Sequence, residues 1–380
     1  MISDDEIKVP EKKRVLQICK YYYPVLGGIE KVARDVAEGL NDCVDMEVMT
    51  AAKVKKTRLE IMNGVKVMRV KMLGAAWSMP VAPGFTRNMI KLSKDTDVMI
   101  IHMPYPVADL SYWLTGFKGK VIAWWHSEIV RQKLVIPLYA PVLRKFLARV
   151  DKIITATPRH IEFSPFLQQF KDKCVIVPYG ISDKDIALDS KGVELYNSLV
   201  KNNEKNLLFV GRLVYYKGVD VLLNAISMVP EAKLWIIGEG YLDNKLEKQA
   251  QNLGIEDRVR FLGALGRQEM LAYLHACTGF VLPSVEKSEA FALAQLEAIA
   301  CGKPVINTML ESGVPFVSLD GETGWTVAPR DVNSLAGAIR ELLNDDEERE
   351  KRGVQAKLRA ETYFRMDDML NAVLKLINER

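Results

Sequence analysis

Short apolar runs of four to six residues recur along the chain, and segments with apolar residues at helical spacing follow them. This alternation is typical of a parallel sheet wound with helices. The pattern stops near residue 178 and restarts at residue 206, so it predicts two sheets. The expected strands are Arg14–Cys19, Asp45–Thr50, Val65–Val70, Val98–His102, Val121–Trp125, Lys152–Ala156 and Cys174–Pro178, then Asn206–Val210, Lys233–Ile237, Arg258–Leu262, Gly279–Leu282, Pro304–Asn307 and Gly324–Val327.

The length of the chain agrees with two domains. Its 380 residues exceed the roughly 100 to 200 residues of a usual domain. We expect α/β architecture with two doubly wound, Rossmann-like domains, residues 1–180 and 181–364, which face each other across a cleft. A last helix, at about Met366–Ile377 within residues 365–380, follows the second domain, and we expect it to pack back on the first.

Composition excludes several classes of protein. The hydrophobic share of 49% and the charged share of 26% are typical of a globular domain. No run approaches the roughly 18 apolar residues of a membrane span, and the polar start Met1–Glu6 is not a signal peptide. The five cysteines show no metal-ligand or redox spacing, so we expect free thiols. These features predict a cytoplasmic protein.

Charge is distributed unevenly along the chain. Residues 1–180 carry 28 Lys and Arg against 18 Asp and Glu, whereas residues 181–380 carry 24 against 30. A basic half favours an anionic partner, either a membrane surface or nucleic acid. The basic, apolar stretch 131–152 suits an anionic bilayer, and residues 75–80 add an apolar anchor. An amphipathic core helix broken by Pro137 and Pro141 is the alternative. No nucleic-acid-binding module is present in the sequence, so we expect no nucleic acid.

Two glutamates bracket the start of a helix in the second half. The helix begins near Phe291, ends at Gly302, and places Glu289 and Glu297 roughly 12 Å apart. Its first-turn amides and dipole favour a diphosphate between the two carboxylates. Glu289 is then left for a sugar and Glu297 for ribose hydroxyls, although two surface glutamates at this spacing are also common. A glycosidase needs two carboxylates at roughly 5 to 9.5 Å, which is closer than this estimate.

Ligands of doubly wound sheets bind beyond the carboxyl ends of the strands. Gly27-Gly28 follows the first strand and opens a helix, which is also the pattern of a plain tight turn. Arg212 and Lys217 flank the corresponding turn of the second domain. They would neutralise a diphosphate leaving group, unless they are only solvated loop cations.

His126 ends another strand, and we expect it to contact the sugar or the acceptor. His102, at the end of the preceding strand, competes for this role, and a lone histidine is more often a core residue. Asp95-Thr96-Asp97 has the carboxylate spacing of metal-dependent glycosyltransferases. However, it precedes its strand, so we interpret it as a solvated loop. The sequence therefore implies no bound metal.

Together these residues resemble the retaining glycosyltransferases of family 4, which have the two-domain GT-B fold, over nearly the whole chain. The resemblance rests on Gly27-Gly28, the strand that ends at His126, the loop from Gly211 to Gly218, the paired glutamates, and residues 300–305. The amino-acid sequence of residues 283–289 and 312–315 is similar to that of bacterial mannosyl- and rhamnosyltransferases of polysaccharide assembly.

The resemblance implies specific roles. Arg212 and Lys217 would hold the donor diphosphate, Glu297 the ribose and Glu289 the donor sugar, while His126 would meet the sugar near its hydroxymethyl end. The turn Gly263-Ala264-Leu265 would contact the base. The remaining donor-binding positions are Ala290, Phe291, Ala292 and Leu293. Relatives usually have glycine where this chain has Ala292, which puts close backbone approach to the phosphates there in question.

The resemblance also implies the reaction: transfer with retention through an oxocarbenium-like state, without a protein nucleophile, a metal or a cofactor. We favour GDP-mannose as donor and a lipid-linked saccharide as acceptor, at the inner face of the cytoplasmic membrane, with dTDP-rhamnose or a UDP-sugar as the alternative donor. A sugar-nucleotide epimerase and a non-catalytic nucleotide-binding protein remain competing hypotheses, because fold does not fix function.

Overall fold

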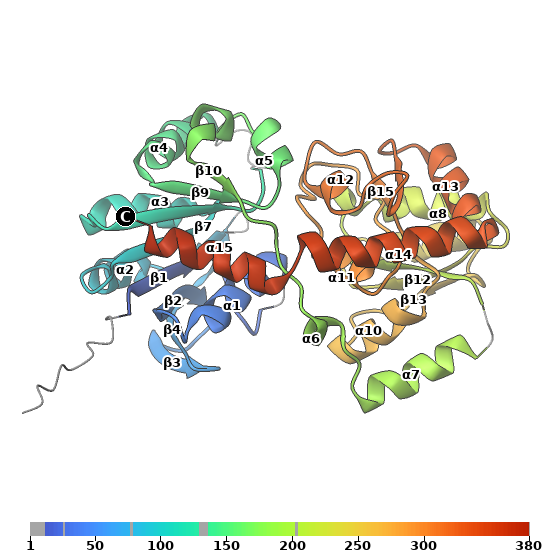
Figure 1. The fold of residues 1–380 in the computed structure, drawn as a ribbon, viewed down its shortest axis with the longest axis horizontal. Coiled ribbons are helices and arrows are strands. Elements are labelled where there is room, and N and C mark those ends of the chain that lie inside the picture. Colours follow the sequence, from blue (N-terminus) through green and yellow to red (C-terminus); the bar gives the residue numbers. More distant parts are fainter. Residues whose placement is uncertain (1–11, 26, 77–78, 129–135, 202–203, 380) are drawn as a thin grey trace, which may run out of the picture.

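The computed structural model describes residues 12–25, 27–76, 79–128, 136–201 and 204–379. Two largely parallel sheets, one in each half of the chain, form two lobes that lie side by side (Figure 1). This arrangement confirms the predicted fold class. The predicted strands of both sheets are also confirmed, to within two residues at each end.

The first lobe is built on an eight-stranded sheet with the order β10-β9-β8-β7-β1-β2-β4-β3. All neighbours are parallel except β3 and β4. Its strands are β1 (Arg14–Cys19), β2 (Asp45–Ala52), β3 (Arg58–Met62), β4 (Val65–Lys71), β7 (Val98–Met103), β8 (Lys120–Trp125), β9 (Lys152–Thr155) and β10 (Cys174–Ile176). Its helices are α1 (Gly28–Leu40), α2 (Phe85–Ser93), α3 (Pro106–Thr115), α4 (Ile136–Arg149), α5 (Pro158–Glu162) and the 3-10 helix η1 (Leu167–Lys173).

The second lobe contains a six-stranded parallel sheet with the order β13-β12-β11-β14-β15-β16. Its strands are β11 (Asn206–Val210), β12 (Lys233–Ile237), β13 (Val259–Phe261), β14 (Gly279–Val281), β15 (Val305–Thr308) and β16 (Gly324–Val327). Its helices are α6 (Asp183–Ile186), α7 (Ser190–Val200), η2 (Tyr215–Lys217), α8 (Val219–Ser227), α9 (Asp243–Asn252), α10 (Arg267–Ala276), α11 (Leu293–Ala300), α12 (Val314–Val317) and α13 (Val332–Asn344).

The last two helices return the chain to the first lobe. Helix α14 (Asp346–Tyr363) lies along the second lobe, and α15 (Met366–Asn378) packs against α1 (Figure 1). Lys13 Nζ donates to the Ile377 carbonyl (2.9 Å), and Lys120 Nζ donates to the Glu379 carbonyl (2.9 Å). Cations thereby meet the negative end of the α15 dipole, which stabilises the docked helix.

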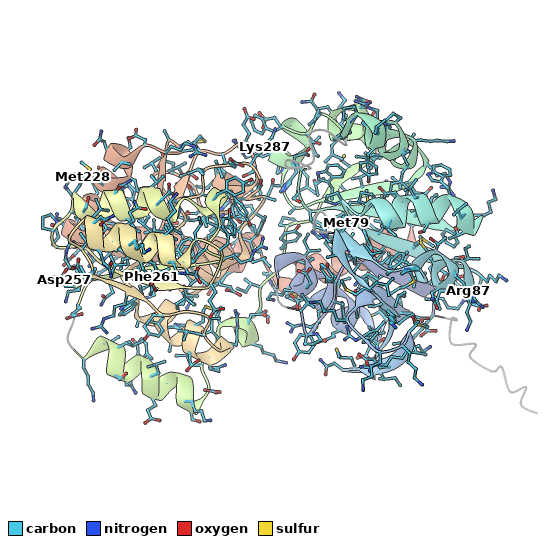
Figure 2. All side chains as sticks on the ribbon, turned by 180° about the vertical axis from the view of Figure 1, so that it is seen from behind. Met79, Arg87, Met228, Asp257, Phe261 and Lys287 are labelled. Atoms are coloured by element: carbon cyan, nitrogen blue, oxygen red, sulfur yellow. The ribbon has the colours of Figure 1, made fainter. Side chains whose placement is uncertain are left out.

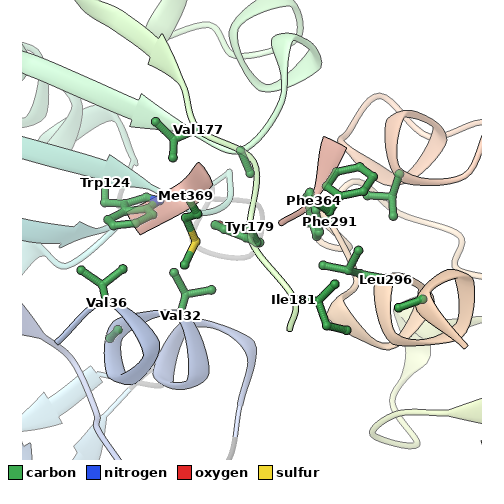
Figure 3. Close-up of a cluster of buried hydrophobic side chains, with 14 of the residues drawn as sticks. Val32, Val36, Trp124, Val177, Tyr179, Ile181, Phe291, Leu296, Phe364 and Met369 are labelled. Atoms are coloured by element: carbon green, nitrogen blue, oxygen red, sulfur yellow. The ribbon is translucent and has the colours of Figure 1, made fainter. Parts of the chain in front are cut away.

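One apolar cluster continues from the first lobe through the connecting segment into the second (Figure 3). Val32 and Trp124 belong to the first lobe, Tyr179 to the connecting segment, and Phe291 and Phe364 to the far side. All five are at most 5% exposed. The two lobes are therefore packed together around Tyr179.

Some local predictions were wrong. Strand β3 was missed because its side chains are mostly exposed, so it lacks an apolar run. The expected loop at residues 75–80 is a small hairpin, β5 (Gly74–Ala76) with β6 (Met79–Val81), and Trp77 and Ser78 lie outside the described residues. Helix α4 runs through Pro141 instead of breaking there. Residues 129–135 of the predicted membrane-binding stretch also lie outside the description.

Candidate active site

The strand ends of the two lobes meet at several points. A Cβ placed on Gly28, in the first turn of α1, would lie 3.6 Å from Leu293 Cδ1, in the first turn of α11. The ring of Tyr179 lies 4.6 Å from that of Phe291. Two helix N-termini, one from each lobe, thus face each other, and both attract anions.

Glu289 and Lys217 form a buried ion pair. Lys217 Nζ lies 2.6 Å from Glu289 Oε2, and Ser284 Oγ donates to the same oxygen at 3.0 Å. Lys217 ends η2 and is held there by Gly218 in the left-handed conformation (φ 67°). Sequence reasoning assigned Lys217 to the diphosphate and Glu289 to the sugar. The structure brings these two side chains into direct contact.

Helix α11 begins at Leu293, two residues after the predicted start. Ala292 precedes it in the left-handed region (φ 62°, ψ 82°), which favours glycine. Glycine would adopt this backbone conformation more easily than Ala292 does. The Ala290 carbonyl accepts a hydrogen bond from Gly313 N at 2.7 Å, so the loop that carries Glu289 is anchored to the turn after β15.

Glu297 lies within α11 and is 7% exposed. Burial raises the pKa of its carboxyl, and Arg267 opposes this shift with an ion pair at 2.7 Å. Arg267 also donates to the Asp185 carbonyl, and Asp185 pairs with Lys31 of the first lobe at 2.9 Å. Arg267 was missed by sequence reasoning. Its position two residues after the predicted base-contacting turn Gly263–Leu265 was the available signal.

Arg212 is exposed and donates to Tyr216 Oη at 3.0 Å. Burial raises the pKa of Glu30, on α1 of the first lobe, and the charges of Lys20 and Arg212 oppose this shift. Gly27 is the extended N-cap of α1, and the Glu30 carboxylate folds back against it. Of these three charged residues, the sequence analysis identified Arg212 and missed Lys20 and Glu30.

His126 is fully enclosed in a hydrogen-bonded row. Its Nε2 lies 2.7 Å from His102 Nδ1, and its Nδ1 lies 2.6 Å from Tyr179 Oη. Burial lowers the pKa of both histidines, so both rings are neutral. The two candidates that competed for one role are thus hydrogen-bonded neighbours. A sugar contact by His126 requires an exchange of one of these partners.

The acidic triplet at residues 95–97 serves the first sheet. Asp97 accepts from Arg14 N (2.8 Å) and pairs with its guanidinium (3.3 Å), which lowers the pKa of the Asp97 carboxyl. Among the described residues, no group of three His, Cys, Asp or Glu side chains is arranged to hold a metal ion. In the same part of the chain, no helix is both long and apolar enough to cross a bilayer.

Two facing Rossmann-like lobes of this kind define the GT-B class of glycosyltransferases. Sucrose-phosphate synthase from Thermosynechococcus elongatus superimposes with a TM-score of 0.80 over 96% of this chain and 98% of that one, at 20% identity. The glycosyltransferase WaaG gives 0.71 over 96% and 100%, at 18% identity. Residues 27–180 match the glycosyl transferase 4-like domain and residues 194–359 the glycosyl transferases group 1. The chain belongs to this glycosyltransferase family, which confirms the resemblance noted in the sequence.

Two curated relatives match nearly end to end. O-antigen chain mannosyltransferase C of Escherichia coli is 31% identical over 96% of this chain and 97% of its own length. D-rhamnosyltransferase WbpZ of Pseudomonas aeruginosa is 31% identical over 92% of each. The protein is thus a glycosyltransferase.

Proposed function

We propose that the protein transfers mannose from GDP-mannose to a lipid-linked saccharide during the synthesis of a cell-surface polysaccharide. The observation that carries this proposal is the buried Lys217–Glu289 pair (2.6 Å) beside the N-terminus of α11. The mannosyltransferase that matches over 96% of the chain supports the choice of sugar and pathway.

In this mechanism the donor diphosphate lies between the first turn of α11 and Arg212. The helix amides and the guanidinium stabilise the negative charge that develops on the leaving group, which replaces the role of a metal ion. Lys217 and Ser284 hold the Glu289 carboxylate, which binds the donor sugar. Retention follows because the acceptor approaches on the face that the diphosphate leaves.

The nucleoside lies in the second lobe. Glu297 binds the ribose, and Arg267 holds the carboxylate in place from the other side. The turn Gly263-Ala264-Leu265 contacts the base; it is fixed by Gly263 (φ 65°) and by the Ala264 amide, which donates to Glu239 Oε1 at 3.3 Å. No cofactor is required.

A second candidate function is transfer of a 6-deoxyhexose such as rhamnose, from a GDP-, dTDP- or UDP-sugar. The D-rhamnosyltransferase relative has the same identity as the mannosyltransferase. In addition, both ring nitrogens of His126 already have protein partners. A sugar that lacks the C6 hydroxyl would leave this row of hydrogen bonds undisturbed.

A thermal-shift screen tests the donor. The purified protein is heated with GDP, UDP, dTDP or ADP and with their sugar conjugates, because a ligand of the folded state raises Tm. A selective shift by GDP and GDP-mannose supports the first candidate, and a shift by a rhamnose conjugate supports the second. A protein that responds to no nucleotide would contradict both. Product analysis separates transfer from epimerisation.

Two further measurements test the chemistry. Glu289→Gln and Arg212→Ala should each lower transfer by on the order of 10²-fold, as for other transition-state contacts. If either variant keeps full activity with every accepted donor, the site assignment is wrong. Transfer should also persist in EDTA, and an activity that the chelator abolishes would contradict the metal-free mechanism.

We also propose that the first lobe docks on the anionic inner face of the cytoplasmic membrane. Leu110, Trp113 and Leu114 lie on one exposed face of α3, and Leu138 on α4 is 81% exposed. Lys145 of α4 lies 5.1 Å from the centroid of the Trp113 ring, so a cation borders this apolar face. Such a combination suits anionic lipid headgroups.

Vesicle sedimentation tests this docking. The protein should sediment with vesicles that contain phosphatidylglycerol and less with pure phosphatidylcholine. Leu114→Asp should reduce the bound fraction several-fold. Leu358→Asp is the matched control, because Leu358 is similarly exposed on α14 of the other lobe. Equal loss in both variants, or no binding by the wild type, would contradict the proposal.

A further inference from the structure

A third buried histidine lies beside the His102–His126 pair. His160, on α5, follows β9, which is the strand next to β8 in the sheet. Burial is the main cause of the lowered pKa of His126, and the electrostatic effects of His102 and His160 add to it. His160 is 6% exposed, and its Nδ1 lies 2.8 Å from Thr157 Oγ1. Its Nε2 is buried and has no hydrogen-bond partner among the described residues.

An unpaired buried nitrogen is destabilising unless a ligand or a water molecule hydrogen-bonds to it. His160 lines a small pocket between the lobes. Glu128, Arg159 and Phe163 line it from the first lobe, and Lys287, Ala290, Glu311 and Ser312 from the second. Lys287 lies at the boundary of the two lobes in Figure 2.

The walls of this pocket are held across the domain boundary. Arg159 donates to the carbonyls of Ser312 (Nε, 2.9 Å) and Leu310 (Nη2, 2.8 Å). A Cβ on Gly313 would lie 2.9 Å from His160 Cε1, so the ring is fixed against the turn after β15. Nδ1 is hydrogen-bonded to Thr157 and Cε1 packs beside Gly313, so Nε2 is the ring atom that is left to hydrogen-bond to a ligand.

The chemistry of the lining indicates the kind of group that binds. Burial lowers the pKa of His160 to about 4, so the ring is neutral and its Nε2 either donates or accepts, according to the tautomer. Glu128 and Glu311 bring negative charge to the lining, and Arg159 and Lys287 bring positive charge, so the two signs are balanced. A hydroxyl group satisfies either tautomer and charges of both signs, whereas a carboxylate, an ammonium or a methyl group does not.

We propose that this pocket receives a hydroxyl of the donor sugar and that His160 determines donor specificity through it. The inference rests on the proposed function, in which Glu289 holds the donor sugar. Ala290, the next residue, lines the pocket and hydrogen-bonds through its carbonyl to Gly313. The edge of the sugar that extends past Glu289 therefore meets His160.

The test compares GDP-mannose with its 2-, 3-, 4- and 6-deoxy analogues as donors. The wild type should discriminate strongly against one analogue, because its absent hydroxyl leaves Nε2 unpaired. His160→Phe should lower kcat/KM for GDP-mannose about tenfold, so that GDP-mannose and that analogue are used equally well. The losses of kcat/KM that the other deoxy analogues show, called penalties below, should stay unchanged. His160→Gln, which keeps a hydrogen-bonding group, should restore part of the discrimination.

His275→Phe is the matched control, since His275 lies on α10, outside this pocket, and its replacement should leave the discrimination between all donors unchanged. The Tm shift caused by GDP reports that each variant is folded. A His160→Phe variant that loses activity equally with all donors, or keeps the wild-type penalties, overturns the inference. So does a changed acceptor KM with the donor penalties intact. A wild type that binds neither GDP nor GDP-mannose refutes the proposed function itself, which is a separate result.

Discussion

At the scale of single residues, the site depends on charges that are removed from water. Lys217 and Glu289 are 9% and 7% exposed, and each would be an isolated buried charge without the other. A pair of this kind adds little net stability, but the loss of one partner is expensive. The contact that holds Glu289, the proposed sugar ligand, therefore also ties the loop before α11 to the turn after β11.

Lys217→Met should destabilise the protein by about 3 kcal/mol, because it leaves the Glu289 carboxylate unpaired. Glu289→Gln should also destabilise it, and the double variant should cost less than the sum of the two single changes. Urea unfolding of the four proteins measures this coupling. Transfer should stay at least about 10²-fold reduced in all three variants. Strictly additive stability losses would show that the ion pair is not coupled.

Asp109 predicts a pH dependence of stability. Its side chain is fully buried, accepts a hydrogen bond from Tyr139 Oη, and has its pKa raised by burial from 3.8 to about 8. Between these values the folded state keeps a proton that the unfolded state releases. Stability should therefore fall as the pH rises from about 4 to 8, by up to about 1.4 kcal/mol per unit.

Asp109→Asn removes this titration, so the Tm of the variant relative to the wild type should rise between pH 5 and pH 8. Calorimetry at several pH values measures the trend. Asp95→Asn is the control, since the Asp95 side chain is 85% exposed and should show a flat difference. A flat difference for Asp109→Asn as well would mean that the buried carboxyl is ionised at neutral pH.

At the scale of elements, the apolar runs were sufficient to predict the buried strands, because a strand covered on both faces is apolar throughout. Strand β3 could not be predicted, since it is exposed and at the sheet edge. The roles of Glu289 and Lys217 were predicted separately, but their pairing was not, because it joins segments about seventy residues apart in the sequence. Likewise, nothing in the sequence pattern indicated that Tyr179 would form a hydrogen bond with His126.

The residue that precedes α11 has an unusual backbone conformation, which leads to a prediction. Ala292 adopts φ 62°, which costs roughly 1 to 2 kcal/mol for an L-residue. Ala292→Gly relieves this cost, but it also increases the conformational entropy of the unfolded chain, which destabilises the folded state by about 0.4 to 1 kcal/mol. The net change in stability should stay within about 1 kcal/mol, with transfer within a few-fold of wild type. Ala292→Val should be clearly worse in both respects, because a β-branched residue tolerates this φ poorly. Lost transfer in Ala292→Gly would assign a role to the methyl group.

At the scale of the whole molecule, two chain segments cross between the lobes, and they are bonded to each other. Ile181 N donates to the Phe364 carbonyl (2.7 Å), and Met366 N donates to the Ile181 carbonyl (3.2 Å). Beside this crossing, Tyr179 contacts Phe291 on one side and His126 on the other. Any change in the angle between the lobes must therefore involve both Phe291, which follows the Glu289 loop, and the hydrogen-bonded row of His126 and His102.

Gly180 lies at this double crossing, where a Cβ would come within 2.5 Å of Met366 Cα and 3.0 Å of Arg365 O. Gly180→Ala must push the two segments apart, because neither contact is with a flexible side chain. In the proposed function the nucleotide binds to the second lobe, so the affinity for GDP should stay within about threefold of wild type. Transfer needs both lobes in the correct relative position and should fall at least about tenfold, since small misplacements of reacting groups are costly.

Gly337→Ala is the control, because that helical position opens to free space and alanine there should stabilise α13 by up to about 1 kcal/mol. Isothermal titration with GDP and transfer assays on both variants separate the two effects, and an equal loss of GDP affinity and transfer in Gly180→Ala would show that the crossing supports the second lobe itself instead of aligning the two lobes.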